Sequence, residues 1–159
     1  MTNVLEELND YLKTLESKAE ALMTEIEMDS IIDESSIDVE TIRLTKLQSK
    51  YNNKYLKEFN IYSDTIEMKK MLKLERWKYY TGRQTNRYYH EHGGQPNELI
   101  NKTDVDKYLD GDDYIQVINK IVSMQKSITD LIEKFSKELS NRGYNLKTIF
   151  EYRKWVACV

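Results

Sequence analysis

The chain has 159 residues, of which 40% are hydrophobic and 32% are charged. This balance is sufficient for one domain but leaves a modest core, which favours elongated helices over a globule. A single proline and five glycines are typical of long helices and disfavour strand-rich folds, and a single cysteine excludes an intramolecular disulfide. No apolar run approaches the ~20 residues that cross a bilayer, so we expect a soluble cytoplasmic protein without a membrane partner.

The net charge of −3 argues against a general nucleic-acid binder, because such proteins are usually basic overall. The charges are unevenly distributed along the chain, however. Residues 25–40 hold seven acids and no lysine or arginine, whereas residues 68–89 hold seven bases against the single Glu75. The average therefore hides an acidic segment and a basic one.

The first predicted helix lies in residues 1–28, where apolar side chains recur at alternating steps of three and four. This spacing is typical of a coiled-coil seam, so we interpret residues 1–28 as an N-terminal coiled-coil extension. The acidic residues that follow interrupt the pattern, and Ser35 or Asp38 is available to cap the next helix. The seam consists of Leu5, Leu8, Leu12, Leu15, Ala19, Leu22 and Ile26.

A second, long helix is predicted to begin between Asp38 and Thr45 and to end near Thr81, because no glycine or proline interrupts the chain before Gly82. Its apolar seam runs through Tyr55, Phe59, Tyr62 and Ile66, and the same spacing then reaches Lys69, Lys73, Arg76, Tyr80 and Arg83. We therefore expect the seam to become a positive ribbon ~20 Å long on one face of the helix.

A run of charge on a helix is usually a solvated face, but aromatic residues are interleaved with this one. Cations neutralise phosphates, and flat rings stack on the unpaired bases that single strands expose. The pattern therefore indicates single-stranded DNA binding, although for Tyr79 we expect packing between helices instead. The candidate DNA-binding residues are Lys69, Lys73, Arg76, Lys78, Tyr80, Arg83 and Arg87.

Residues 81–113 are predicted to form a linker, with a short helix near Glu98 or Asp104, and they complete a middle region of residues 29–113. Residues 114–159 then form a C-terminal helical region with the longest seam in the chain. Its apolar surface exceeds what one chain of this size is expected to bury, which predicts a closed homo-oligomer. The candidate oligomerisation residues are Ile118, Ile121, Ile128, Ile132, Phe135, Leu139, Leu146 and Ile149.

Two features of the C-terminal seam leave alternatives open. Gly143 either ends one helix, so that a last helix follows, or weakens a single long helix, and we favour a kink or break. The polar residues Gln125, Arg142 and Arg153 either set register and face solvent or bind a ligand, and we favour the former.

No catalytic constellation is evident in the sequence. His90 and His92 lack the further ligands that a zinc site needs, and no phosphate-binding glycine loop or nucleophile motif is present. A nuclease would need clustered acids near the basic ribbon, whereas the acids are mostly remote in sequence. We therefore expect a protein that is not an enzyme and that uses no metal or cofactor.

Four segments, "MDSIIDESSID", "LQSKY", "LERWKYYTGR" and "NRGYNLKTIFEYRKW", together resemble the UvsY family of recombination mediators from large tailed phages. "LERWKYYTGR" is similar to the family stretch in which a basic segment leads into a tyrosine pair and Gly-Arg, and Arg76 matches the family arginine. The lysine expected two residues earlier is Leu74 in this chain. The family order also holds for the other segments, with "MDSIIDESSID" and "LQSKY" before this stretch and "NRGYNLKTIFEYRKW" after it. The resemblance therefore covers about Leu22 to the end.

The resemblance implies an all-α protein of long helices, in which a helical-hairpin or coiled-coil protomer assembles into a ring-like homo-oligomer. It also implies a function in DNA recombination and repair. The protein would bind single-stranded DNA and help a RecA-like recombinase of the UvsX type to displace single-strand-binding protein, in the host cytoplasm if it is phage-encoded. The alternative is a structural coiled-coil scaffold, for which the basic ribbon would only be solvated.

Overall fold

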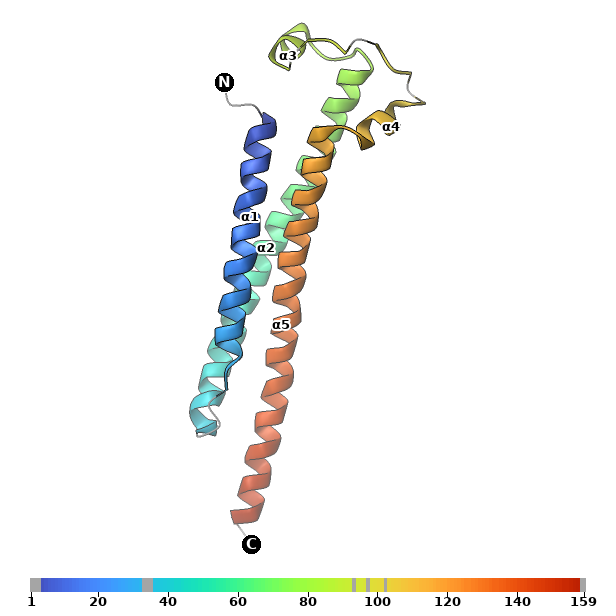
Figure 1. The fold of residues 1–159 in the computed structure, drawn as a ribbon. Helices are drawn as coiled ribbons and strands as arrows, with labels where there is room; N and C mark the ends of the chain where they lie inside the picture. Colours follow the sequence, from blue (N-terminus) through green and yellow to red (C-terminus); the bar gives the residue numbers. More distant parts are fainter. Residues whose placement is uncertain (1–3, 33–35, 93, 97, 102, 158–159) are drawn as a thin grey trace. The chain divides into compact units, whose positions relative to one another are not determined.

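The computed structural model describes residues 4–32, 36–92, 94–96, 98–101 and 103–157 (Figure 1). Within these ranges the chain is helical and contains no strand, which confirms the all-α prediction. None of these helices carries an apolar stretch of the length that a bilayer crossing requires. The five helices are α1 (Val4–Ser30), α2 (Ile37–Tyr80), α3 (Asn86–Glu91), α4 (Val105–Asp110) and α5 (Asp113–Ala157).

The bounds of α2 agree closely with the prediction. The helix begins at Ile37, one residue before the predicted range, and ends at Tyr80. Asp38 lies in its first turn rather than before it, where the negative charge favours the positive end of the helix dipole. Ser35, the other predicted cap, lies outside the described residues.

The predicted linker contains two short helices. α4 begins one residue after Asp104, where a short helix was predicted, whereas α3 was not predicted. The side chain of Thr85 caps α3 by accepting a hydrogen bond of 3.2 Å from the backbone N–H of Tyr88.

The expected break at Gly143 is wrong, because α5 continues through it as one helix of 45 residues. A Cβ atom at residue 143 would lie 3.2 Å from Cδ2 of Leu44, which is a tight contact. The glycine therefore lets α5 approach α2 closely, and this packing accounts for a residue that otherwise disfavours the helix.

The helices contribute to two compact units, which cut across the three predicted segments. Unit 1 comprises residues 1–15 and 62–125, and unit 2 comprises residues 16–61 and 126–159. In unit 1 a buried cluster of Val105, Leu109 and Ile115 joins α4 to the start of α5. Side chains of α2 and of the loop pack against this cluster, among them Leu72, Trp77, Tyr80 and Ile100.

In unit 2, parts of α1, α2 and α5 pack side by side (Figure 1). The fully buried ring of Tyr51 in α2 meets Phe135 of α5 edge to face, with 4.7 Å between the ring centroids. Arg142 of α5 donates a hydrogen bond of 3.1 Å to the backbone carbonyl of Ser30, at the end of α1. A core drawn from all three helices is the result.

The predicted oligomerisation surface is wrong for seven of its eight residues, because they are buried inside the chain. Only Ile149 of the eight is well exposed, at 43%. Three helices of a single chain supply enough apolar surface to cover the seam, which the sequence analysis did not expect. The seven buried residues are Ile118, Ile121, Ile128, Ile132, Phe135, Leu139 and Leu146.

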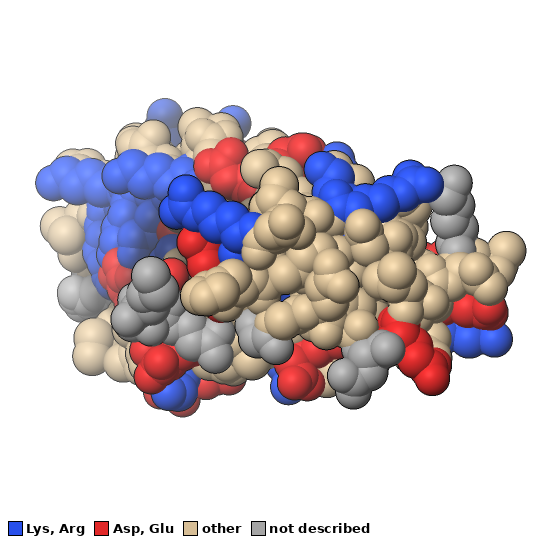
Figure 2. Space-filling view, turned by 90° about the horizontal axis from the view of Figure 1, so that it is seen from above, with Lys and Arg blue, Asp and Glu red and all other residues tan. Residues whose placement is uncertain are grey.

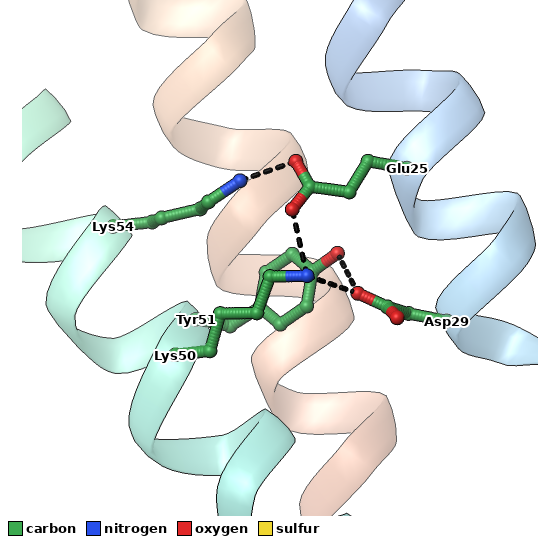
Figure 3. A network of polar contacts seen from close by, with 5 residues as sticks. All are labelled: Glu25, Asp29, Lys50, Tyr51 and Lys54. Atoms are coloured by element: carbon green, nitrogen blue, oxygen red, sulfur yellow. Dashed lines mark hydrogen bonds and ion pairs between the residues drawn. The ribbon is translucent and has the colours of Figure 1, made fainter.

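A polar network fixes α1 against α2 in unit 2 (Figure 3). Lys50 contacts Asp29 at 2.5 Å and Glu25 at 2.7 Å, while Lys54 also pairs with Glu25. The hydroxyl of Tyr51 donates to Asp29 at 2.9 Å. Two carboxylates of the acidic segment are thus neutralised by lysines of the same chain.

Candidate nucleic-acid interface

The C-terminal end of α2 closes in a Schellman motif at Gly82. Arg83 N–H donates to the carbonyl of Lys78 at 2.8 Å, and Gly82 N–H donates to that of Tyr79 at 3.4 Å. Gly82 has φ +72°, a left-handed conformation that favours glycine. This turn directs the chain out of the helix, so that basic residues lie both before and after the helix end.

A buried ion pair joins the last turns of α2 to the start of α5. The guanidinium of Arg76 donates to Oδ2 of Asp112 through Nε at 2.8 Å and Nη2 at 2.7 Å, and the hydroxyl of Tyr80 donates to the same oxygen at 2.7 Å. Oδ1 of Asp112 accepts from the backbone N–H groups of Tyr114 and Ile115, at 3.0 and 3.3 Å. Asp112 is therefore both the cap of α5 and the counter-ion of Arg76.

Aromatic rings enclose this guanidinium. The Cζ atom of Arg76 lies 4.3 Å from the ring centroid of Tyr79, 4.6 Å from that of Tyr114 and 5.4 Å from that of Tyr80. Burial alone would lower the pKa of Arg76, but the bond to Asp112 raises it above its ordinary value. Arg76 stays charged, and its charge is satisfied inside the protein.

The predicted ribbon is therefore wrong at two of its members. Arg76 is only 7% exposed, and Tyr80 is half-buried with its hydroxyl bound to Asp112. Helical periodicity placed both residues on one face correctly, but it could not show that α4 and the start of α5 cover that face. The expectation that Tyr79 packs between helices agrees with its ring contacts to Tyr88 and Tyr89 of α3.

The other cations of α2 remain accessible. Lys69 is half-buried, and Lys73 is exposed with a long ion pair of 3.5 Å to Asp106 of α4. Lys78 is half-buried near the helix end. An exposed pair of this length contributes little to stability, so Lys73 is free to exchange Asp106 for a phosphate.

Beyond the helix end, Arg83 and Arg87 extend the basic surface. The guanidinium of Arg83 lies 5.0 Å from the ring centroid of Trp77, and the side chain of Arg87 is 87% exposed beside Glu91. Figure 2 shows many lysine and arginine side chains at the left of the view and others at the upper right, with acidic side chains between them. We call Lys69, Lys73, Lys78, Arg83 and Arg87 the basic surface.

Aromatic rings lie beside the basic surface, where Tyr88 and His92 are half-buried and Tyr108 is exposed. Tyr88 and His92 of the α3 region lie nearly parallel, with 3.8 Å between centroids and 9° between planes. Tyr108 of α4 is 50% exposed and lies 6.0 Å from the ring centroid of Tyr80. Tyr89, by contrast, is buried and has no face for a base.

The described part of the chain contains no group of three or more His, Cys, Asp or Glu side chains that could hold a metal ion. His90 is exposed, while Nδ1 of His92 lies 2.9 Å from the carbonyl oxygen of Tyr88. The two histidine side chains therefore have different local contacts and do not form one set of metal ligands.

Sequence reasoning missed Asp112 and Tyr108. Asp112 carried a usable signal, because an aspartate directly before a periodic apolar run is a typical helix cap. No signal in the sequence indicated its ion pair with Arg76, since the two residues are 36 positions apart. Tyr108 had no periodic partner in the sequence, and only the placement of α4 brings it near the end of α2.

The comparison with protein families gives a match over residues 25–158 to the family described as "Recombination, repair and ssDNA binding protein UvsY". The chain belongs to the UvsY family. This match confirms the resemblance and the function in recombination, repair and single-stranded DNA binding. Residues 4–24, most of α1, lie outside the matched range.

Two solved structures of UvsY resemble the chain. The crystal structure of the bacteriophage T4 recombination mediator protein UvsY in lattice type II has a TM-score of 0.74 and 21% identity, covering 87% of this chain and 96% of that one. The lattice type IV structure has a TM-score of 0.69 and 20% identity, with 86% and 97% covered. At this identity the likeness shows the UvsY fold. A comparison with curated proteins finds no match.

Proposed function

We propose that this UvsY-family chain is a recombination mediator that binds single-stranded DNA through the basic surface and the aromatic rings beside it. The observation that carries the proposal is the position of Arg83 and Arg87 just beyond the end of α2, with Trp77, Tyr88 and Tyr108 on the same unit. The cations neutralise phosphates, and the rings offer faces on which unpaired bases stack, each stack contributing about 1–3 kcal/mol.

Within this proposal Arg76 has a positioning role. Its charge is already paired with Asp112 and it is buried, so a phosphate cannot reach it without disrupting the α2–α5 junction. The tie through Asp112 holds the start of α5, and α4 before it, against the last turns of α2. Lys73, Lys78, Arg83 and Arg87 then supply the contacts that the ribbon was expected to supply.

We further propose that several copies act together as a ring-like homo-oligomer that loads a RecA-like recombinase in place of single-strand-binding protein, in the cytoplasm of the host. Several weak sites in one assembly can raise avidity by ~10²–10⁴ without a new contact. Such sites open one at a time, so a growing recombinase filament can replace them in succession. No step requires an enzymatic activity of the chain itself.

The proposal is tested first on strand binding, with the triple variant Lys78→Ala, Arg83→Ala, Arg87→Ala. We expect at least tenfold weaker binding to a single-stranded oligonucleotide, with a shallower salt dependence because fewer counterions are released. The matched control is Lys46→Ala, Lys126→Ala, Lys134→Ala, which removes three exposed cations of unit 2. Equal loss in both variants would assign binding to general charge and overturn the site.

Mediation needs a second measurement, the ATPase of the cognate recombinase on a strand already covered by single-strand-binding protein. The wild type should shorten the lag before ATP hydrolysis, and the triple variant should not. If the wild type binds single strands and leaves the lag unchanged, mediation is wrong. A wild type that binds no single strands would instead indicate the scaffold alternative.

A further inference from the structure

An apolar groove in unit 1 lies between the first turns of α1 and the C-terminal half of α2, and its volume is about 610 Å³. Two methionines of α2, Met68 and Met71, are 49% and 66% exposed there. Methionine side chains adapt to irregular partners and are typical of surfaces that receive a helix. The apolar lining is formed by Val4, Leu8, Tyr11, Met68, Met71 and Leu72.

The charged residues that line this groove are all acidic. Its remaining lining residues are Glu7, Asp64, Glu67 and Glu75, so that four carboxylates and no cation line it. Glu67 pairs with Lys70 at 2.7 Å, but this pair is exposed on both sides and contributes little. The lining therefore favours a partner helix that is apolar on one face and positively charged.

The same chain carries a helix segment with that chemistry at the C-terminal end of α5, in unit 2. Tyr144, Tyr152 and Trp155 are exposed by 73%, 64% and 66%. At 100° per residue these three fall within about 80° of one another and form a single aromatic stripe. Residues 144–157 also hold Lys147, Arg153 and Lys154 against Glu151, which is three cations minus one acid, or a charge of +2.

Residues 147–157 of α5 are exposed on every face, and two hollows of unit 2 adjoin other parts of this segment. Arg142, Leu146, Ile149 and Arg153 line a cavity with Ile32 and Ile37. Lys147 and Phe150 line another with Ile42 of α2. The residues of the aromatic stripe line neither cavity, so the stripe is a separate exposed face of α5.

We propose that the groove of unit 1 receives the aromatic stripe of α5 from a second copy of the chain. This inference rests on the homo-oligomer in the proposed function and identifies the surfaces that form it. The two surfaces differ, so the contact is heterologous, and a heterologous contact that closes produces a ring. It also gives a role to the N-terminal extension outside the family match, because Val4, Glu7, Leu8 and Tyr11 belong to it.

The charge contribution is tested by exchanging the signs of the two surfaces. We expect Glu67→Lys with Glu75→Lys in the groove, and Lys147→Glu with Lys154→Glu in the stripe segment, each to weaken self-association at least tenfold in sedimentation velocity without DNA. The four substitutions combined should restore it, because the charges are again opposite. Failure of the combined variant to recover would overturn the pairing of these two surfaces.

The apolar contribution is tested with Met71→Glu, which should also weaken self-association at least tenfold. The matched control is Met28→Glu, because Met28 of α1 is 65% exposed but lies outside the groove. Circular dichroism should show unchanged helix content for both variants. Assembly of Met71→Glu at the wild-type level would overturn the groove as the receiving surface while leaving the homo-oligomer intact. A wild type that is monomeric would overturn both.

Discussion

At the scale of single residues, Asp112 determines the geometry of the candidate site. Its two carboxylate oxygens accept from the side chains of Arg76 and Tyr80 and from two backbone N–H groups of α5. A buried ion pair is weak evidence for high stability, but removal of one partner leaves an uncompensated charge. Replacement of Asp112 should therefore destabilise the protein more than replacement of the exposed acids around it.

We expect Asp112→Asn to lower the free energy of unfolding by about 3–5 kcal/mol, because Arg76 loses its counter-ion in a buried site. The amide oxygen can still cap α5, so the loss reports mainly on the charge. Thermal and chemical unfolding followed by circular dichroism measures the change. Asp110→Asn is the control, since Asp110 is exposed two residues away; equal losses in the two variants would contradict the assignment.

The sequence predicted which residues of this site share one face of α2, but not which of them are exposed and which are buried. Periodicity placed Arg76 and Tyr80 on the face of Lys69 and Lys73, and all four do occur on one helix that ends within one residue of the predicted position. Which of them is covered depends on α4 and Asp112, 36 residues beyond Arg76. Long-range burial of this kind leaves no periodic trace in a single sequence.

At the scale of helices, two glycines that follow helix ends differ in what they require. Gly82 has φ +72°, and a Cβ atom there would lie 2.9 Å from Cδ2 of Leu99. Gly111, after α4, has φ −88° and only ordinary contacts. Only Gly82 therefore has a backbone conformation and surroundings that favour glycine over residues with a side chain.

Gly82→Ala should therefore lower the free energy of unfolding by about 1–2 kcal/mol, the cost of a left-handed conformation for an L-residue. Gly111→Ala should be neutral or raise it by about 0.4–1 kcal/mol, because the unfolded chain loses freedom at no cost to the native conformation. Urea unfolding at one pH compares the two. Similar values for both variants would show that the turn at Gly82 does not require glycine.

The network between α1 and α2 predicts a dependence of stability on pH. The hydrogen bonds from Lys50 and Lys54 lower the pKa of Glu25 below its ordinary value of 4.5. Burial opposes the charge on Asp29, but Lys50 and Tyr51 still lower its pKa below 3.8. Because both pKa values are depressed on folding, the stabilisation is complete above pH 4.5 and is lost as the pH falls through the folded values.

Glu25→Gln should accordingly destabilise the protein by up to about 1 kcal/mol at pH 7, since these pairs are partly exposed. The difference from wild type should shrink as the pH falls from 5 to 3. Urea titrations across this range measure it, with Glu27→Gln, on the exposed side of α1, as the control. A difference that stayed constant with pH would exclude the ion pairs as its cause.

At the scale of the whole molecule, the net charge of −3 conceals how the charges are used. Glu25 and Asp29 of the acidic segment are paired with lysines of unit 2, whereas Lys78, Arg83 and Arg87 of unit 1 lack a buried counter-ion. The all-helical class and the bounds of α2 followed from composition and periodicity. The burial of the C-terminal seam inside one chain did not follow from them. Apolar spacing is the same whether the partner helix belongs to the same chain or to another.

For the assembled state we expect light scattering to return a multiple of the 19.0 kDa chain mass at micromolar concentration. The exposed aromatic residues of α5 would otherwise remain in contact with water, at a cost of about 25 cal/mol for each Å². Dilution should lower the mass, as expected for a reversible association. A constant 19.0 kDa would show that the protein functions as a monomer.

The tie between Arg76 and Asp112 also has a consequence for how this chain can change over generations. Loss of either residue alone leaves a buried charge unpaired, so each single replacement is penalised while a simultaneous replacement of both by uncharged residues is tolerated better. Positions 76 and 112 should therefore be inherited as a pair. Lys78, Arg83 and Arg87, which have no such tie, are free to vary one at a time as the strand-binding surface adapts.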